Sequence, residues 1–70
     1  MKRMDLRTAR TRAKLSQHAL AEAADVAQPI ISRIENGQVS NPAFDTVIKL
    51  AKALDLDPRV LQFGQEAKAS

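Results

Sequence analysis

The sequence predicts an all-α domain of five short helices. Hydrophobic residues make up 44% of the 70 positions, and most of them are alanine and leucine, which favour helices. Aromatic residues, which favour strands, are scarce: the chain has two phenylalanines and no tryptophan or tyrosine. Helix start and stop signals recur at short intervals along the chain. A chain of this length builds one compact core, so we expect a single domain over residues 1–70.

The first expected helix lies in the basic stretch that ends before Leu15. A second helix is predicted over residues 17–24, because the hydroxyl of Ser16 can cap its N-terminus. One face of that helix collects its apolar residues Leu20, Ala21 and Ala24. Residues 25–27 then interrupt the periodic pattern.

A third helix is predicted over residues 28–35, because Pro29 is tolerated in a first helical turn. Its apolar periodicity is carried by Ile30, Ile31 and Ile34. Asn36 and Gly37 end it, since both residues accept the left-handed conformation that closes a helix.

A fourth helix is predicted to begin at Asn41-Pro42, with the asparagine as N-cap and the proline at the first helical position. Apolar residues follow at a helical spacing: Phe44, Val47, Ile48, Leu50, Ala51 and Leu54. Lys49 and Lys52 fall on the solvent side of this helix.

Asp57-Pro58 repeats the same start signal for a short fifth helix. This helix is expected to contain Val60, Leu61 and Phe63. Gly64 is expected to end it, and residues 65–70 are interpreted as a flexible tail.

Several function classes find no support in the sequence. The chain has no cysteine, which excludes disulfide scaffolds, thiol catalysis and cysteine metal sites. The single histidine, His18, is expected to be a solvated surface residue, and Asp57 is interpreted as a cap rather than as an acid–base partner of Asp55. No apolar run approaches the ~20 residues of a membrane span, and residues 1–12 lack a signal-peptide core. We therefore expect a soluble cytoplasmic protein that is not an enzyme and uses no cofactor or metal.

The charge is concentrated at one end of the chain. The formal net charge is +3, but residues 1–14 carry six basic side chains and one acidic side chain, so the rest of the chain is slightly acidic. A basic end on a small domain suggests a polyanionic partner such as nucleic acid, or an anionic membrane surface. The alternative interpretation is a solvated helix face.

The most informative stretch is a helix-turn-helix pattern at about residues 16–36, in which the second helix is the one that enters the DNA major groove. Residues in and after it stand in a fixed order: Leu15-Ser16-Gln17, Leu20-Ala21, Val26, Ile31-Ser32-Arg33-Ile34-Glu35-Asn36-Gly37, Asn41-Pro42 and Leu50-Ala51-Lys52-Ala53-Leu54. This string resembles the lambda-repressor-like (Xre-type, Cro/repressor) helix-turn-helix family of prokaryotic and phage regulators. The resemblance extends from Leu6 to Leu61 without a gap.

Two positions depart from the pattern of that family. Asp25 stands where the family usually has glycine, and aspartate tolerates the left-handed geometry better than most residues. Ala27 stands where the family commonly has a serine or threonine cap, and the loss of a cap costs ~1 kcal/mol. Pro29 offsets part of that loss by restricting the unfolded chain.

The resemblance and the outward positions of the third helix predict a base-reading surface. Its expected members are Gln28, Pro29, Ile30, Ser32 and Arg33. Gln28 can read adenine through paired hydrogen bonds, while Arg33 can read guanine or hold a phosphate. Ile30 and Pro29 can contact a thymine methyl. For Ile30, a place in the core is the alternative and ranks close behind.

Phosphate contacts are expected from three parts of the chain: the basic N-terminal stretch, the start of the second helix, and the loop after the third helix. Similar domains place a glutamine at the position of Gln17, where helix amides and the helix dipole also favour a phosphate. The alternative for Gln17 is simple solvation. The full set of expected phosphate ligands is Gln17, Arg7, Lys14, Asn36, Gln38, Ser40 and Asn41. We expect Arg3, Arg7, Arg10 and Lys14 to share one broad helical stripe, with Arg12 pointing elsewhere.

Two further contacts follow from the resemblance. Similar domains pair an arginine of the first helix with the glutamate before the Asn-Gly end, which here implies an ion pair between Arg10 and Glu35. Related repressors also pair through their C-terminal helices, which implies a dimer surface made of Ile48, Val60 and Phe63 in one exposed patch. The alternative for Phe63 is a lid over the core.

The resemblance implies a sequence-specific DNA-binding transcriptional regulator, and more narrowly a repressor that binds a palindromic operator as a homodimer. One module reads only a few base pairs, so two-fold pairing is the usual route to adequate specificity. An alternative from another class is an antitoxin that binds a toxin protein and autoregulates its operon. Non-specific binding of nucleic acid through the basic N-terminus is a third possibility. Double-stranded DNA is the expected partner in the leading interpretation, and no membrane is involved.

Overall fold

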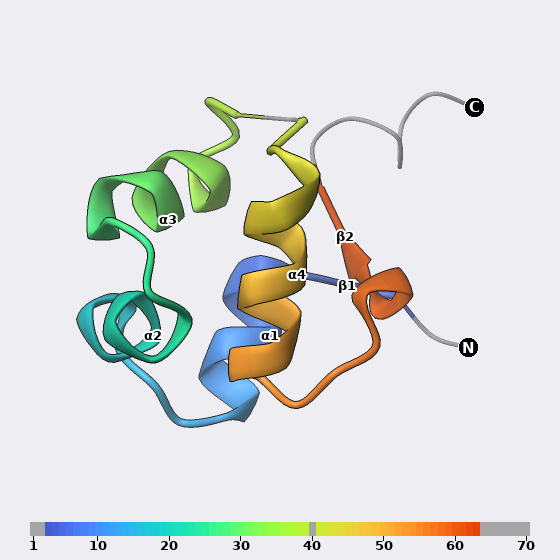
Figure 1. Cartoon of the computed structure of the whole chain (residues 1–70), viewed down its shortest axis with the longest axis horizontal. Coiled ribbons are helices and arrows are strands. Elements are labelled where there is room, and N and C mark those ends of the chain that lie inside the picture. The colour runs from blue at the N-terminus through green and yellow to red at the C-terminus, as the bar shows by residue number, and fades with distance from the viewer. Residues whose placement is uncertain (1–2, 40, 64–70) are drawn as a thin grey trace.

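The computed structural model describes residues 3–39 and 41–63. This part of the chain forms four α-helices, one 3₁₀ turn and one pair of two-residue strands (Figure 1). In chain order these are β1 (Met4–Asp5), α1 (Leu6–Arg12), α2 (Gln17–Ala24), α3 (Gln28–Glu35), α4 (Phe44–Ala53), the 3₁₀ turn η1 (Pro58–Val60) and β2 (Leu61–Gln62). The fold is mostly helical as predicted, but the expected fifth helix is replaced by η1 and β2.

The end of the described chain shows why the fifth helix is absent. Asp57 does cap a turn, because its Oδ1 accepts the backbone N–H of Arg59 at 2.9 Å. Leu61 then becomes extended, and β2 pairs in parallel with β1 in the register Met4↔Leu61 and Asp5↔Gln62. This pairing satisfies backbone groups and buries Leu61, which a frayed last helical turn does not do. The predicted stop at Gly64 and the tail over residues 65–70 lie outside the described residues.

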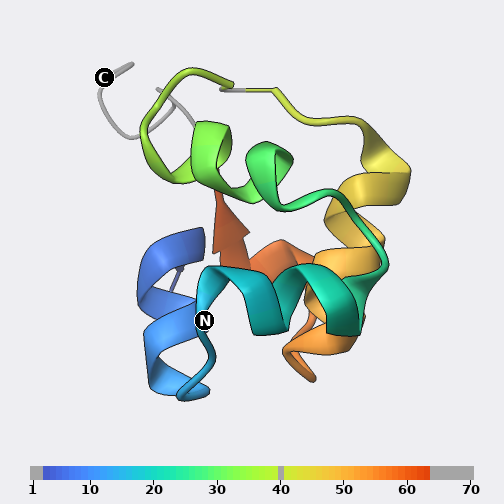
Figure 2. The same ribbon diagram turned by 90° about the vertical axis from the view of Figure 1, so that its left-hand side faces the viewer.

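The core lies where the four helices meet. Its four largest fully buried side chains come one from each helix, and they are Leu6, Leu20, Ile31 and Leu50. Buried alanines of α1, α2 and α4 let the helix backbones approach closely. Figure 2 shows α3 lying across the domain above α2, with α1 and α4 on either side. The outer side of α3 is therefore turned away from the rest of the domain.

The predictions for α2 are confirmed at both ends. Ser16 Oγ accepts the backbone N–H of Ala19 at 3.0 Å, so the serine is the N-cap. Asp25 ends the helix in the left-handed conformation, with φ 59° and ψ 47°. The third helix also has its predicted bounds, and Ala27 precedes it without any side-chain cap.

The predicted start of α4 is wrong by two residues. Ala43, not Asn41, is the residue before its first turn, and it makes no side-chain hydrogen bond. Phe44 was expected on the apolar face, but its side chain is 78% exposed. The buried residues of α4 itself are Leu50 and Ala51, so the core covers the later part of this helix and its first turn lies outside.

Candidate nucleic-acid interface

The inner face of α3 is fixed by apolar burial. Ile31 is fully buried and Ile34 nearly so, and both belong to the main core. Ile30 and Val26 are half-buried and pack against that core. Ile30 therefore contacts the core, which is one of the two roles predicted for it, and a base contact from it stays a prediction.

The outer face of α3 carries polar side chains on a rigid support. Gln28, Pro29, Arg33 and Asn36 are exposed, and Ser32 is half-buried. The Asn36 amide lies 3.5 Å from Ser32 Oγ, at the limit of a hydrogen bond. The amide of Gln28 and the guanidinium of Arg33 are the groups that recognise adenine and guanine edges in a major groove. Both stand on the side of α3 that the core leaves open.

The last residue of α3 is held by side chains from the two preceding helices. Glu35 has no exposed side-chain surface. Arg10 donates to it twice, from Nε to Oε2 at 2.6 Å and from Nη2 to Oε1 at 3.1 Å. Arg10 Nη1 also donates to the carbonyl oxygen of Leu15 at 2.8 Å. All three nitrogens of this guanidinium are therefore used inside the domain.

Two expected phosphate ligands also contact Glu35, which the sequence reasoning missed. Gln17 Nε2 donates to Glu35 Oε1 at 3.0 Å, and Arg7 Nε donates to the same oxygen at 3.4 Å. Gln17 is half-buried, while the Arg7 side chain is 57% exposed. A chemical argument could have found these contacts, because a buried carboxylate has two oxygens and needs more donors than one arginine supplies.

The ionisation of this cluster follows from its packing. Burial alone raises the pKa of Glu35, but the hydrogen bonds from Arg10 and Gln17, with the charge of Arg10 and the contact of Arg7, reverse the effect. The pKa of Glu35 therefore lies below its ordinary value of 4.5. The hydrogen bond to Glu35 likewise raises the pKa of Arg10. The pair is charged at neutral pH and links α1 to α3.

The basic N-terminal stretch does not form one helical stripe. Helix α1 covers only Leu6–Arg12, so Arg3 lies before β1 and Lys14 follows the helix with φ 63°. Arg3, Arg7 and Lys14 are each exposed, but they are presented by three different pieces of backbone. The stripe was predicted from a helix longer than the real one, which ends because Lys14 is left-handed.

The comparison with family models decides the family. A model described as Helix-turn-helix matches residues 6–61, which is most of the chain. The chain belongs to the helix-turn-helix family. This confirms the resemblance to lambda-repressor-like (Xre-type) regulators and makes the protein a DNA-binding transcriptional regulator. The helix-turn-helix unit itself consists of α2, the turn at residues 25–27, and α3.

Among solved structures, this helix-turn-helix protein is similar to the restriction-modification controller protein C.AhdI from Aeromonas hydrophila. The two share 39% sequence identity with a TM-score of 0.73, and the match covers 77% of this chain and 80% of that chain. No curated protein matches the chain. In the described part of the chain, no helix has the length and apolar character needed to cross a membrane.

The loop after α3 contributes polar side chains beside the helix-turn-helix unit. Gly37 is left-handed with φ 80°, and it turns the chain away from α3. Gln38 and Asn41 are exposed on this loop, and the predicted phosphate ligand Ser40 lies outside the described residues.

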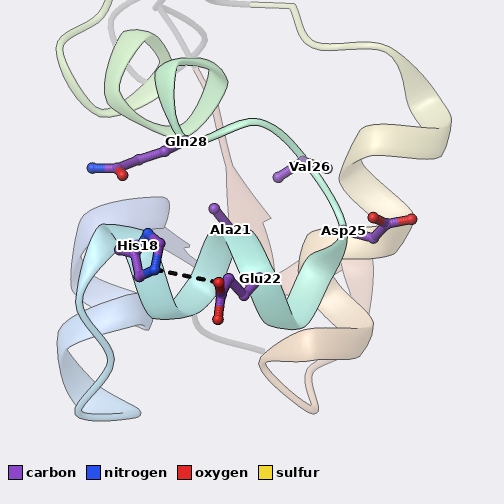
Figure 3. Close-up of a pocket in the computed structure, with 6 residues that line it drawn as sticks. All are labelled: His18, Ala21, Glu22, Asp25, Val26 and Gln28. Atoms are coloured by element: carbon purple, nitrogen blue, oxygen red, sulfur yellow. Dashed lines mark ion pairs between the residues drawn. The ribbon is translucent and has the colours of Figure 1, made fainter.

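A shallow groove runs between the two helices of the helix-turn-helix unit (Figure 3). It has a volume of about 380 Å³ and is lined by His18, Ala21, Glu22, Asp25, Val26 and Gln28. His18 Nε2 lies 3.3 Å from Glu22 Oε2, and both side chains are largely exposed, so His18 is the surface residue that was predicted. Across residues 3–39 and 41–63, no group of histidine or carboxylate side chains is gathered for a metal ion.

The expected dimer residues differ in exposure from the prediction. Ile48, Val60 and Phe63 are all half-buried, and Phe63 packs against the core as in the lid alternative. Among the described residues, the large hydrophobic side chain that is clearly exposed is Phe44, one helical turn before Ile48. Sequence reasoning missed it because the helical spacing of α4 assigned it to the buried face.

Proposed function

We propose that this regulator binds a specific operator by inserting α3 into the DNA major groove. The observation that carries the proposal is the division of α3 into two sides. Its inner side is fixed by Ile31, Ile34 and the bonds to Glu35, while Gln28 and Arg33 stand exposed on the outer side. A helix held in this way can present side chains to base edges without reorganising on binding.

The DNA backbone would be held by groups on either side of α3. Arg7 and Lys14 are exposed cations near the start of the domain, and Gln17 is the first residue of α2. The loop residues Asn36, Gln38, Ser40 and Asn41 add only amide and hydroxyl groups. We therefore expect Arg7 and Lys14 to supply most of the salt dependence of binding at the N-terminal side.

The regulator would act as a homodimer on a palindrome and repress by occupying a promoter. One copy of α3 reads too few base pairs for adequate specificity, and a two-fold pair doubles the reading. Ile48 and Val60 remain the proposed contact residues, and the exposed ring of Phe44 extends that surface. Phe63 contributes at its outer edge, since it also packs on the core.

The proposed dimer is tested by sedimentation of two variants. Phe44→Glu and Val60→Glu should each give a folded monomer, because a charge at an interface opposes pairing without opening the core. An unaltered dimer in both variants would contradict this surface. Phe63→Glu is the matched comparison, and it should unfold the chain because its ring packs against the core.

The operator proposal is tested by selecting bound sequences from a random pool of DNA duplexes with the full chain. Enrichment of two inverted half-sites, centred about one helical turn or a multiple of it apart, is the expected result. The likeness to a restriction-modification controller makes promoters of restriction-modification genes the first natural DNA to examine. A pool that remains unenriched would reduce the function to non-specific nucleic-acid binding. Co-purification of a small partner protein would support the antitoxin alternative instead.

A further inference from the structure

We propose that Glu35 is a positioning residue for phosphate binding by Gln17, an inference that rests on the function proposed above. Glu35 cannot reach DNA itself, because none of its side-chain surface is exposed. It accepts a hydrogen bond from Gln17 Nε2 at 3.0 Å. An ionised carboxylate only accepts hydrogen bonds, so the Gln17 amide must turn its nitrogen, and not its oxygen, toward Glu35.

This bond determines what the Gln17 amide can offer to DNA. A primary amide nitrogen carries two N–H groups, and only one of them is used by Glu35. Within the described residues Gln17 Nε2 makes no other hydrogen bond, so its second N–H is available to a phosphate oxygen. Gln17 begins α2, where the backbone N–H groups of the first turn also lack helical partners. Glu35 thus keeps a donor rather than an acceptor at the place where the phosphate would lie.

The position of Glu35 is itself fixed, which makes the orientation of Gln17 well defined. Arg10 holds both carboxylate oxygens and is only 14% exposed. Arg7 offers a contrast on the same oxygen, since its contact is longer at 3.4 Å and its side chain is 57% exposed. Arg7 can turn to a phosphate without Glu35, whereas the half-buried amide of Gln17 depends on it.

A double-mutant cycle on operator affinity separates positioning from simple support of the fold. In the wild-type background, Gln17→Ala should weaken binding about tenfold, as expected for one lost hydrogen bond to a charged group. In the Glu35→Gln background the same change should weaken binding less than about twofold, because glutamine accepts as well as donates and no longer orients the amide. Lys14→Ala is the matched control, because Lys14 is an exposed cation and the contacts of Glu35 described above do not include it. Its cost should be the same in both backgrounds.

The second readout uses operator duplexes in which one phosphate at a time is replaced by an uncharged methylphosphonate. Wild-type protein should bind one modified duplex more weakly, and Gln17→Ala should not, which identifies the phosphate that Gln17 contacts. Glu35→Gln should likewise bind that duplex as tightly as the unmodified operator. A purely structural role for Glu35 would lower affinity for every duplex and leave the sensitivity in place. All variants are compared at a temperature where circular dichroism shows them folded.

Glu35→Gln leaves Arg10 without its counter-charge, so a second background keeps the test decisive. Arg10→Met combined with Glu35→Gln removes both charges together, which is often tolerated where the loss of one partner is not. An equal tenfold cost of Gln17→Ala with and without the Glu35 carboxylate overturns the positioning role. Wild-type protein that fails to prefer its selected operator overturns the proposed function, and this is seen before any variant is examined.

Discussion

The two helices of the helix-turn-helix unit have the same length but are held in different ways. Helix α2 is defined locally, by the Ser16 cap at its start and the left-handed Asp25 at its end. Helix α3 begins at Gln28, after Ala27, which provides no side-chain cap. Its position depends on buried isoleucines and on the contacts of Glu35. The ends of α2 are therefore set locally, whereas α3, the helix that we propose inserts into DNA, is positioned by the rest of the domain. Its outer side is then left without a structural role.

Removal of the Glu35 carboxylate at the end of α3 should be the most destabilising change. Glu35→Ala leaves Arg10 with an uncompensated, mostly buried charge, which should lower the free energy of unfolding by about 3–5 kcal/mol. Urea denaturation measures this loss. Arg7→Ala is the control, because its exposed contact should be worth less than about 1 kcal/mol. Equal losses in the two variants would show that α3 does not depend on this carboxylate.

The hydrogen-bonded Glu35 carboxylate also makes the stability of the protein depend on pH. The pKa of Glu35 is lowered in the folded protein, so its contribution is present above the ordinary value of 4.5 and is lost as pH falls through the folded pKa. Asp5 and Asp57 also have lowered pKa values, the latter about 2 through its hydrogen bonds with Arg59, and they share in the acid loss. Between pH 6 and pH 3, the free energy of unfolding should therefore change less with pH for Glu35→Gln than for the wild type. An equal pH dependence of the unfolding free energy in the two proteins would contradict the lowered pKa of Glu35.

The next effect tests the local control of α2. Ser16→Ala removes the acceptor for the Ala19 N–H, and we expect the free energy of unfolding to fall by about 1 kcal/mol. Thermal unfolding followed by circular dichroism is sufficient to detect the change. A variant as stable as the wild type would show that α2, like α3, is held mainly by its neighbours.

The smallest effect is a gain at the uncapped start of α3. Ala27 has φ −70° and ψ 137°, the extended geometry of an N-cap, so Ala27→Ser should place a hydroxyl near the free amides of the first turn. We expect stability to rise by about 0.5–1 kcal/mol in the same melting experiment. A loss of stability would mean that the hydroxyl finds no such amide, and that the start of α3 has another determinant.

The contrast between the helices also explains what the sequence allowed us to predict. The bounds of α2 follow from the Ser16 cap and the turn at Asp25, and those of α3 from Pro29, the Asn36-Gly37 stop and the apolar periodicity between them. The prediction of a fifth helix was wrong because Leu61 pairs with Met4, which lies near the other end of the chain. The predicted burial of Phe44 was wrong because a helical period does not show how far the core extends along α4. Such features depend on which segments meet in space.

In the candidate site, too, features set by one helix could be predicted, and features that join several helices could not. The exposed positions of Gln28 and Arg33 on α3 followed from the periodicity of the isoleucines. The convergence of Arg7 and Gln17 on Glu35 did not, because it joins side chains from three helices. The pair of Arg10 and Glu35 was reached only through the resemblance to a family.

Arg33, the exposed arginine of α3, provides the test of whether this helix presents base-reading side chains. The measurement is the affinity of Arg33→Ala for the selected operator and for a set of its single-base variants, with Arg7→Ala measured in parallel. We expect Arg33→Ala to lose about 1–3 kcal/mol of binding free energy and its preference at one base pair. Arg7→Ala should instead weaken binding evenly and reduce the salt slope by about one. If Arg33→Ala weakens binding evenly on every sequence, Arg33 is a phosphate contact and does not read a base.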